Sequence, residues 1–101
     1  MSENLLNLVN TIRDKKKKDK EKSYTSSLLS GGLSKCIDKM EEEFDELKEA
    51  LNDKSNVVHE AADTIYHILV TLEAANIKFE DVLKELENRK EKSGIEEKNN
   101  R

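Results

Sequence analysis

Residues 57–75 read VVHEAADTIYHILVTLEAA and form the most apolar segment of this 101-residue chain. Apolar side chains fall on nearly every side of the helix that this pattern predicts, so the helix needs cover all round. A chain of this length can supply only a few shorter helices as cover. The segment therefore predicts an all-α fold in which a second copy of the chain completes a dimeric helical bundle.

Three further segments repeat apolar residues at helical spacing. Residues 33–51 carry a strict heptad seam, which favours antiparallel packing against residues 57–75 through the apolar seams. Residues 23–30 read as a short amphipathic turn that ends at two glycines, so we expect four helices, in residues 3–14, 33–51, 57–75 and 79–92. The apolar residues of the three further helices are Leu5, Leu6, Val9 and Ile12; Leu33, Ile37, Met40, Phe44, Leu47 and Leu51; and Phe79, Val82, Leu83 and Leu86.

The composition excludes several classes of protein. The chain has no Pro, no Trp, two Phe and two Tyr, which disfavours β sandwiches and barrels. The single cysteine, Cys36, rules out an internal disulfide and is expected to be a small core residue. No apolar run is long enough for a membrane span and residues 1–10 do not resemble a signal peptide, so we expect a soluble, cytoplasmic protein. The net charge of −4 favours cations over nucleic acid as partners.

Two carboxylates interrupt the most apolar helix. Glu60 and Asp63 stand three residues apart and therefore on one face, and no Lys or Arg occurs between Ser55 and Ile77 to neutralise them. Carboxylates that are removed from water need a counter-charge or a proton. The preceding helix adds more negative charge, because Glu43 lies beside its apolar seam and Glu46 lies one step further round.

Packed antiparallel, the two helices would bring together Glu43, Glu46, Glu60 and Asp63. Four carboxylates at short range repel each other unless a hard divalent cation lies between them, and oxygen-only ligands suit Mg²⁺ or Mn²⁺. The sequence therefore predicts a metal site in this interface.

A purely structural interpretation stays open for these acids. Glutamates on helices often form solvated faces, and Lys39 or Lys48 could pair with the carboxylates of the apolar helix. Neither histidine of this helix is expected to bind the metal: His59 is interpreted as a surface residue and His67 as a hydrogen-bonded core residue.

The acidic pattern resembles that of a known superfamily. Glu42, Glu43 and Glu46 form E-E-x-x-E, and Glu60 and Asp63 form E-x-x-D, as in the all-α nucleoside triphosphate pyrophosphatases, the MazG-like superfamily. Three segments narrow the resemblance: SYTSSLL at 23–29, EAADTIYHILV at 60–70 and SGIEEK at 93–98. Together they look like the phosphoribosyl-ATP pyrophosphohydrolase family, over residues 5–101.

The resemblance implies hydrolysis of phosphoribosyl-ATP to phosphoribosyl-AMP and pyrophosphate, the second step of histidine biosynthesis. It implies Mg²⁺ as cofactor, with Mn²⁺ as a substitute, in a homodimer or higher homo-oligomer. Glu43, Glu46, Glu60 and Asp63 would bind the metal, and Glu42 would join Glu43 as a catalytic acid of the motif, either orienting water or binding a second metal ion. The candidates for substrate contacts are Lys39, Arg89 and Lys92 for phosphate, and Ser23, Tyr24 and Thr25 for phosphate or ribose.

Two other functions remain open from the sequence. The first is a related pyrophosphatase that acts on another nucleoside or deoxynucleoside triphosphate. The second is a non-catalytic module that binds a partner helix through the heptads of residues 33–51. With the pyrophosphatase function we expect one domain over residues 1–101, with an N-terminal helix and Lys-rich segment in 1–22, the catalytic helices in 23–93 and a polar tail in 94–101.

Overall fold

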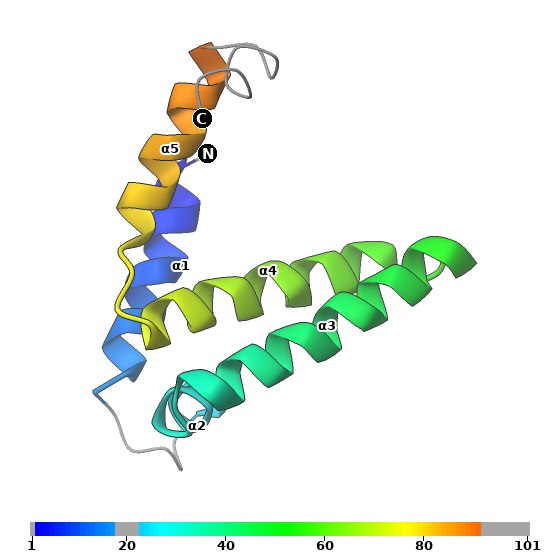
Figure 1. Cartoon of the computed structure of the whole chain (residues 1–101), viewed down its shortest axis with the longest axis horizontal. Helices are drawn as coiled ribbons and strands as arrows, with labels where there is room; N and C mark the ends of the chain where they lie inside the picture. Colours follow the sequence, from blue (N-terminus) through cyan, green and yellow to red (C-terminus); the bar gives the residue numbers. More distant parts are fainter. Residues whose placement is uncertain (1, 18–22, 92–101) are drawn as a thin grey trace.

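A computed structural model describes residues 2–17 and 23–91, and within these ranges it is all-helical, without strands (Figure 1). The all-α prediction is confirmed. The helices are α1 (Ser2–Lys15), α2 (Tyr24–Ser30), α3 (Leu33–Asp53), α4 (Val57–Ala74) and α5 (Phe79–Glu91). None of the helices in the described part of the chain has the length and apolar character that crossing a membrane requires.

The described residues form five helices rather than the expected four, because residues 24–30 fold as α2 instead of a turn. Ser23 starts this helix: its Oγ accepts a hydrogen bond from the backbone N–H of Ser26 at 2.9 Å. Gly31 ends α2, and Gly32 starts α3 at a φ of 92°, a conformation that favours glycine. Local capping therefore produces a helix that is too short to show in the apolar periodicity.

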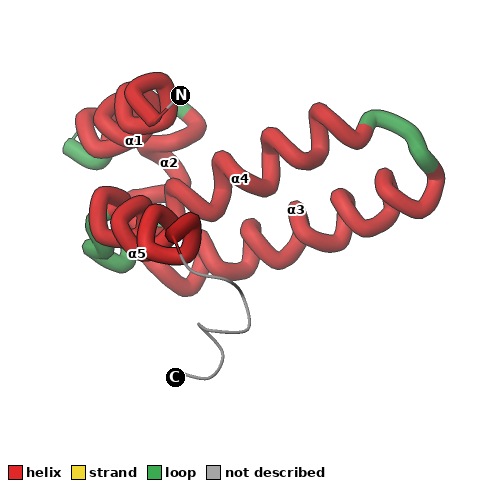
Figure 2. The backbone as a smooth tube through the Cα atoms, turned by 90° about the horizontal axis from the view of Figure 1, so that it is seen from above, coloured by secondary structure: helices red, strands yellow, loops and turns green. Residues whose placement is uncertain are grey.

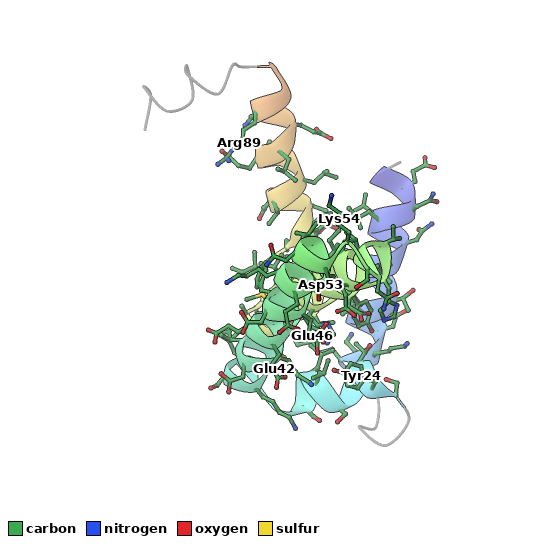
Figure 3. The ribbon with its side chains drawn as sticks, turned by 90° about the vertical axis from the view of Figure 1, so that its right-hand side faces the viewer. Tyr24, Glu42, Glu46, Asp53, Lys54 and Arg89 are labelled. Atoms are coloured by element: carbon green, nitrogen blue, oxygen red, sulfur yellow. The ribbon has the colours of Figure 1, made fainter. Side chains whose placement is uncertain are left out.

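Helices α3 and α4 form a long antiparallel hairpin, and α1 and α5 lie side by side across its open end (Figure 1, Figure 2). The turn of the hairpin is tight because Lys54 and Asn56 both adopt a φ of 56°. Asp53 and Lys54, at this turn, face the viewer in Figure 3. Asn76 follows the end of α4 with a φ of 60°, the left-handed conformation in which helices commonly end and which asparagine tolerates.

The hydrophobic core lies at the open end of the hairpin, where all five helices meet. Each fully buried aliphatic or aromatic side chain stabilises this end by about 1.5–3 kcal/mol. Cys36 belongs to the core, as predicted, with 2% of its surface exposed. The core consists of Val9 and Ile12 of α1, Leu28 of α2, Cys36 of α3, Leu69 and Val70 of α4, and Phe79 of α5.

The prediction that α3 packs on α4 through its heptad seam is wrong. The buried residues of α3 are Cys36, Glu43 and Ala50, which lie one step round the helix from the seam. Two of these three side chains are small and suit the contact between two helices. Four of the six seam residues are exposed instead: Leu33, Ile37, Phe44 and Leu51.

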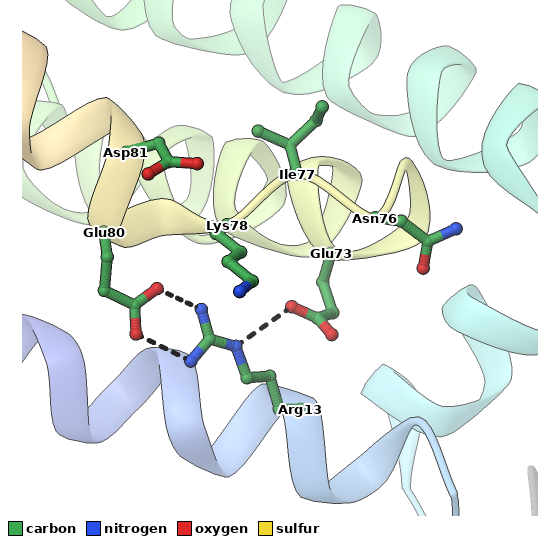
Figure 4. A pocket seen from close by; sticks show the side chains of 7 residues that line it. All are labelled: Arg13, Glu73, Asn76, Ile77, Lys78, Glu80 and Asp81. Atoms are coloured by element: carbon green, nitrogen blue, oxygen red, sulfur yellow. Dashed lines mark hydrogen bonds and ion pairs between the residues drawn. The ribbon is translucent and has the colours of Figure 1, made fainter.

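Charged side chains connect α1 to the end of α4 and the start of α5 (Figure 4). The guanidinium of Arg13 donates two hydrogen bonds to the carboxylate of Glu80, one of them at 2.9 Å. It donates a third hydrogen bond to the carboxylate of Glu73 at 3.4 Å. Lys16 adds bonds to the backbone carbonyl of Glu73 at 3.1 Å and to Asn76 at 2.6 Å. These contacts hold α1 against the end of α4, and Arg13 lowers the pKa of Glu80 to about 2.

We expect the Arg13–Glu80 pair to stabilise the fold above pH 4.5 and to lose its effect as the pH falls through about 2, because Glu80 must stay ionised. Glu80→Gln should lower the melting temperature at pH 7 by a small amount, about 1–4 °C, since the pair is partly exposed. Thermal unfolding at pH 7 and pH 2, followed by circular dichroism, measures this. An equal drop in Glu87→Gln, an exposed residue of the same helix, would contradict the prediction.

Candidate metal centre

The hairpin brings acidic side chains of α3 and α4 together in its middle. Carboxylate oxygens of Glu43, Glu46 and Glu60 all lie within 4.8 Å of one another. These are three of the four acids for which the sequence predicted convergence. The fourth, Asp63, belongs to an adjoining group, in which atoms of His59, Glu60 and Asp63 lie within 4.8 Å of one another. Glu60 is common to both groups.

Glu43 is the most deeply placed of these acids, with 8% of its surface exposed. One oxygen of Glu43 and one of Glu60, both Oε2, are buried without a hydrogen-bond partner in the described part of the chain. Burial raises the pKa of Glu43, and the carboxylate of Glu46 raises it further. Burial also raises the pKa of Glu60, and the carboxylate of Glu46 adds a smaller rise. Orphaned, desolvated carboxylate oxygens are the groups that a divalent cation would satisfy, so these residues fit a metal.

The second acidic group includes a histidine nitrogen that could bind a metal. His59 is exposed, as the sequence predicted, and its Nε2 lies 3.2 Å from Oδ2 of Asp63. Asp63 is half-buried, and it lies close to Glu60, which also belongs to the group of Glu43 and Glu46. A part for His59 in this group was not predicted, although His59 directly precedes Glu60 in the sequence.

Glu42 lies outside both groups. Its carboxylate is 3.1 Å from Nζ of Lys39, and 63% of its side chain is exposed. Figure 3 labels Glu42 and Glu46 on α3, one turn apart. The predicted catalytic acid Glu42 and the predicted phosphate contact Lys39 therefore form an ion pair on the surface beside the centre.

Helix α2 is tied to the acidic turn of α4 through His67. The ring nitrogen Nδ1 lies 2.8 Å from the backbone carbonyl of Asp63, and a carbonyl only accepts, so Nδ1 carries a proton. In the neutral ring, Nε2 then accepts from the hydroxyl of Tyr24 at 3.1 Å. His67 is buried with both nitrogens bonded, which confirms its interpretation as a satisfied core residue. Burial raises the pKa of Tyr24, nearby Lys39 opposes this, and Glu43 adds to the rise.

The other predicted substrate contacts have different surroundings. Ser23 caps α2, and Thr25 is 2% exposed with its hydroxyl against that of Tyr66. Arg89 lies near the end of α5, 3.7 Å from Glu85 and well away from Glu42 and Glu46 (Figure 3). Lys92 lies outside the described residues, as does the segment SGIEEK.

The pockets of the described residues are shallow. One of about 660 Å³ is lined by Arg13 and Glu80, whose charges are already paired, among other residues. Another of about 270 Å³ borders the acids and is lined by Glu46, Glu60 and residues near the hairpin turn. This second pocket lies beside candidate metal ligands.

Two threonines of α4 are buried against α3, which the sequence did not predict. Thr64 and Thr71 each place a hydroxyl against the backbone of α3. Their seven-residue spacing within an apolar helix was the signal that could have placed them on its buried face.

Comparison with known proteins gives a consistent set of relatives. The model of the family described as phosphoribosyl-ATP pyrophosphohydrolase matches residues 5–90. A phosphoribosyl-ATP pyrophosphatase of Rhizobium etli is 40% identical over 99 residues, covering 96% of this chain and 92% of the relative. The proteins of the same name from Paracoccus denitrificans and Clostridium acetobutylicum are each 43% identical, over 93% and 90% of this chain and 89% and 84% of the relatives.

We expect Glu43→Gln to stabilise the metal-free protein. Because the pKa of Glu43 is raised in the folded state, that state binds more protons than the unfolded chain at pH values just above 4.5, and stability falls as the pH rises through this window. Glutamine carries no charge, so the variant should melt higher in EDTA at pH 7, by about 4–8 °C for each kcal/mol of repulsion relieved.

Differential scanning calorimetry at pH 7 and pH 4 measures this difference, which should narrow at pH 4. Asp45→Asn, an exposed acid of the same helix, is the matched control and should melt like the native chain. A lower melting temperature for Glu43→Gln in metal-free buffer would count against desolvated repulsion at the centre.

Proposed function

The chain belongs to the phosphoribosyl-ATP pyrophosphohydrolase family, and from this premise we propose that it hydrolyses phosphoribosyl-ATP to phosphoribosyl-AMP and pyrophosphate, the second step of histidine biosynthesis. The observation that carries the proposal is the pair of buried carboxylate oxygens of Glu43 and Glu60 between α3 and α4, which have no hydrogen-bond partner among the residues that the structure describes. An enzyme that acts on a triphosphate needs cations to neutralise the phosphate oxygens, and these carboxylates are suited to hold them.

We propose Mg²⁺ as the cation, with Mn²⁺ as a substitute, held by Glu43, Glu46, Glu60 and Asp63. Oxygen ligands favour these hard ions, and the carboxylates of three of the four acids are within 4.8 Å of one another. When bound, such an ion polarises phosphate oxygens and lowers the pKa of a bound water molecule. Glu42 and Glu43 are the acids that orient the attacking water. The ion pair between Glu42 and Lys39 would have to break before Glu42 could do so.

The remaining substrate contacts differ in what their surroundings allow. Lys39 and Tyr24 are accessible beside the acids and suit a phosphate and a ribose, and Ser23 is half-buried next to Tyr24. Thr25 is buried, so its part is to hold α2 against Tyr66. Arg89 would reach this centre only from a second copy of the chain, and Lys92 stays a prediction from the sequence.

We also propose that two copies of the chain form a dimeric bundle through one face of the hairpin. Successive residues advance about 100° round a helix. A residue that comes directly after a buried or half-buried position of the α3–α4 contact therefore points to the same side of the antiparallel pair on both helices. Exposed apolar residues occupy these places, and an apolar stripe of this kind marks an interface. They are Ile37, Phe44 and Leu51 on α3, at 37%, 42% and 55% exposure, and Val58 and Ile65 on α4, at 85% and 52%.

The catalytic proposal predicts Mg²⁺-dependent release of pyrophosphate, faster from phosphoribosyl-ATP than from any member of a panel of deoxynucleoside triphosphates. Glu43→Gln and Asp63→Asn should each reduce turnover by about 100-fold or more, since losing an outer-shell partner alone costs about 10–100-fold. Asp45→Asn should keep native turnover.

A coupled pyrophosphate assay with each substrate, with and without EDTA, makes the measurement. Faster turnover of a deoxynucleoside triphosphate would assign a different substrate. Turnover that is insensitive to EDTA and to both substitutions would support the non-catalytic helical module.

The dimer proposal predicts a particle of twice the 11.6 kDa chain mass in sedimentation equilibrium. Ile65→Glu places a charge in the apolar stripe and should give a folded monomer, because the side chain is exposed within one chain. Leu86→Glu, at 53% exposure on α5, should remain dimeric. A monomeric native chain, or an Ile65→Glu dimer of native affinity, would refute this interface.

A further inference from the structure

Two threonines of α4 make the same pair of hydrogen bonds, seven residues apart. Oγ1 of Thr64 lies 2.8 Å from the carbonyl oxygen of Glu60, one turn back on α4, and 3.2 Å from the carbonyl oxygen of Glu43 on α3. Oγ1 of Thr71 lies 2.7 Å from the carbonyl oxygen of His67 and 3.2 Å from that of Cys36. Both threonines are buried, with exposures of 3% and 8%. Each hydroxyl therefore shares its proton between the backbones of two helices.

The two bridges differ in the residues that they join. Thr64 connects the backbones of Glu43 and Glu60, whose carboxylates meet in the candidate metal centre. Thr71 connects Cys36 with His67, which belong to neither group of potential ligands. The chain thus contains an internal control for the bridge at Thr64: the same residue type, the same pair of helices and the same geometry, without the acids.

The hydrogen bonds of Thr64 lie where two carboxylates repel each other across the hairpin. Glu43 and Glu60 are desolvated, their pKa values are raised, and neither buried Oε2 has a partner in the described residues. Repulsion between these carboxylates favours separation of the two turns that carry them. The hydroxyl of Thr64 opposes this separation by bonding to the main chain, so it leaves every carboxylate oxygen available to a cation.

We propose that Thr64 is a positioning residue for the metal centre, whose hydroxyl holds the backbones of Glu43 and Glu60 at the separation that a divalent cation requires before the cation binds. The inference rests on the proposed function only in treating these acids as metal ligands. Preorganisation of this kind strengthens binding because less order has to be imposed when the ligand arrives.

The test uses the full chain without substrate and titrates it with Mn²⁺, followed by electron paramagnetic resonance of the free ion. Thr64→Val keeps the shape and removes the hydroxyl, and it should weaken Mn²⁺ binding about 10-fold or more, as the loss of an outer-shell partner does. Thr64→Ser keeps the hydroxyl and should bind within about twofold of the native chain. Thr71→Val removes the matched bond and should also bind within about twofold.

Circular dichroism of each variant establishes that it is folded, and Thr64→Ala with Thr71→Ala replaces the valine pair if a valine variant does not fold. Equal weakening at positions 64 and 71, native binding in Thr64→Val, or loss of binding in Thr64→Ser would each overturn the inference. The failure of the proposed function has a different signature: a native chain that binds Mn²⁺ but releases no pyrophosphate from phosphoribosyl-ATP.

Discussion

Negative charge inside the α3–α4 interface is the constraint on which the rest of the structure depends. Glu43 is almost fully buried against α4, and the carboxylates of Glu46 and Glu60 lie within 4.8 Å of its own. Repulsion between these carboxylates opposes the packing of α3 on α4 unless a cation or a proton neutralises them. The cohesion comes from elsewhere: from the core at the open end of the hairpin, where all five helices meet, and from the threonine hydroxyls that bond to the backbone of α3.

The geometry of an antiparallel pair divides the hairpin into two faces with different chemistry. Glu46 follows the buried Glu43 by three residues and Glu60 precedes the buried Thr64 by four, which places them about 60° and about 40° to one side. Phe44 and Ile65 follow the same two buried residues by one and lie about 100° to the other side. The acids therefore occupy one face and the exposed apolar stripe occupies the opposite one. A second chain could cover the stripe without closing the acidic face, so the proposed dimer and the proposed metal site do not compete for one surface.

Much of the fold was predictable from the sequence because it rests on local rules. Apolar spacing located the four longer helices, and small, apolar Cys36 was placed in the core. The face of α3 that meets α4 was not predictable. The sequence favours packing through the most apolar seam of α3, and that seam is not the face that α4 covers. The chain instead buries Cys36, Glu43 and Ala50 there and leaves most of the seam exposed.

The acids of the candidate site were predictable for a related reason: a carboxylate within an apolar helix stands out in a sequence. A hydroxyl does not, since threonine is common on both exposed and buried faces, and its bond to a carbonyl of another helix depends on the register between them. The same applies to Tyr24, which bonds to His67 across 43 residues of sequence, while His67 bonds to the carbonyl of Asp63. Through these two bonds α2 is fixed to the acidic turn of α4 and lies on the face of the hairpin that carries the acids. A segment remote in sequence thus becomes a wall of the candidate site through neutral hydrogen bonds, which add no charge to an interface that already carries too much.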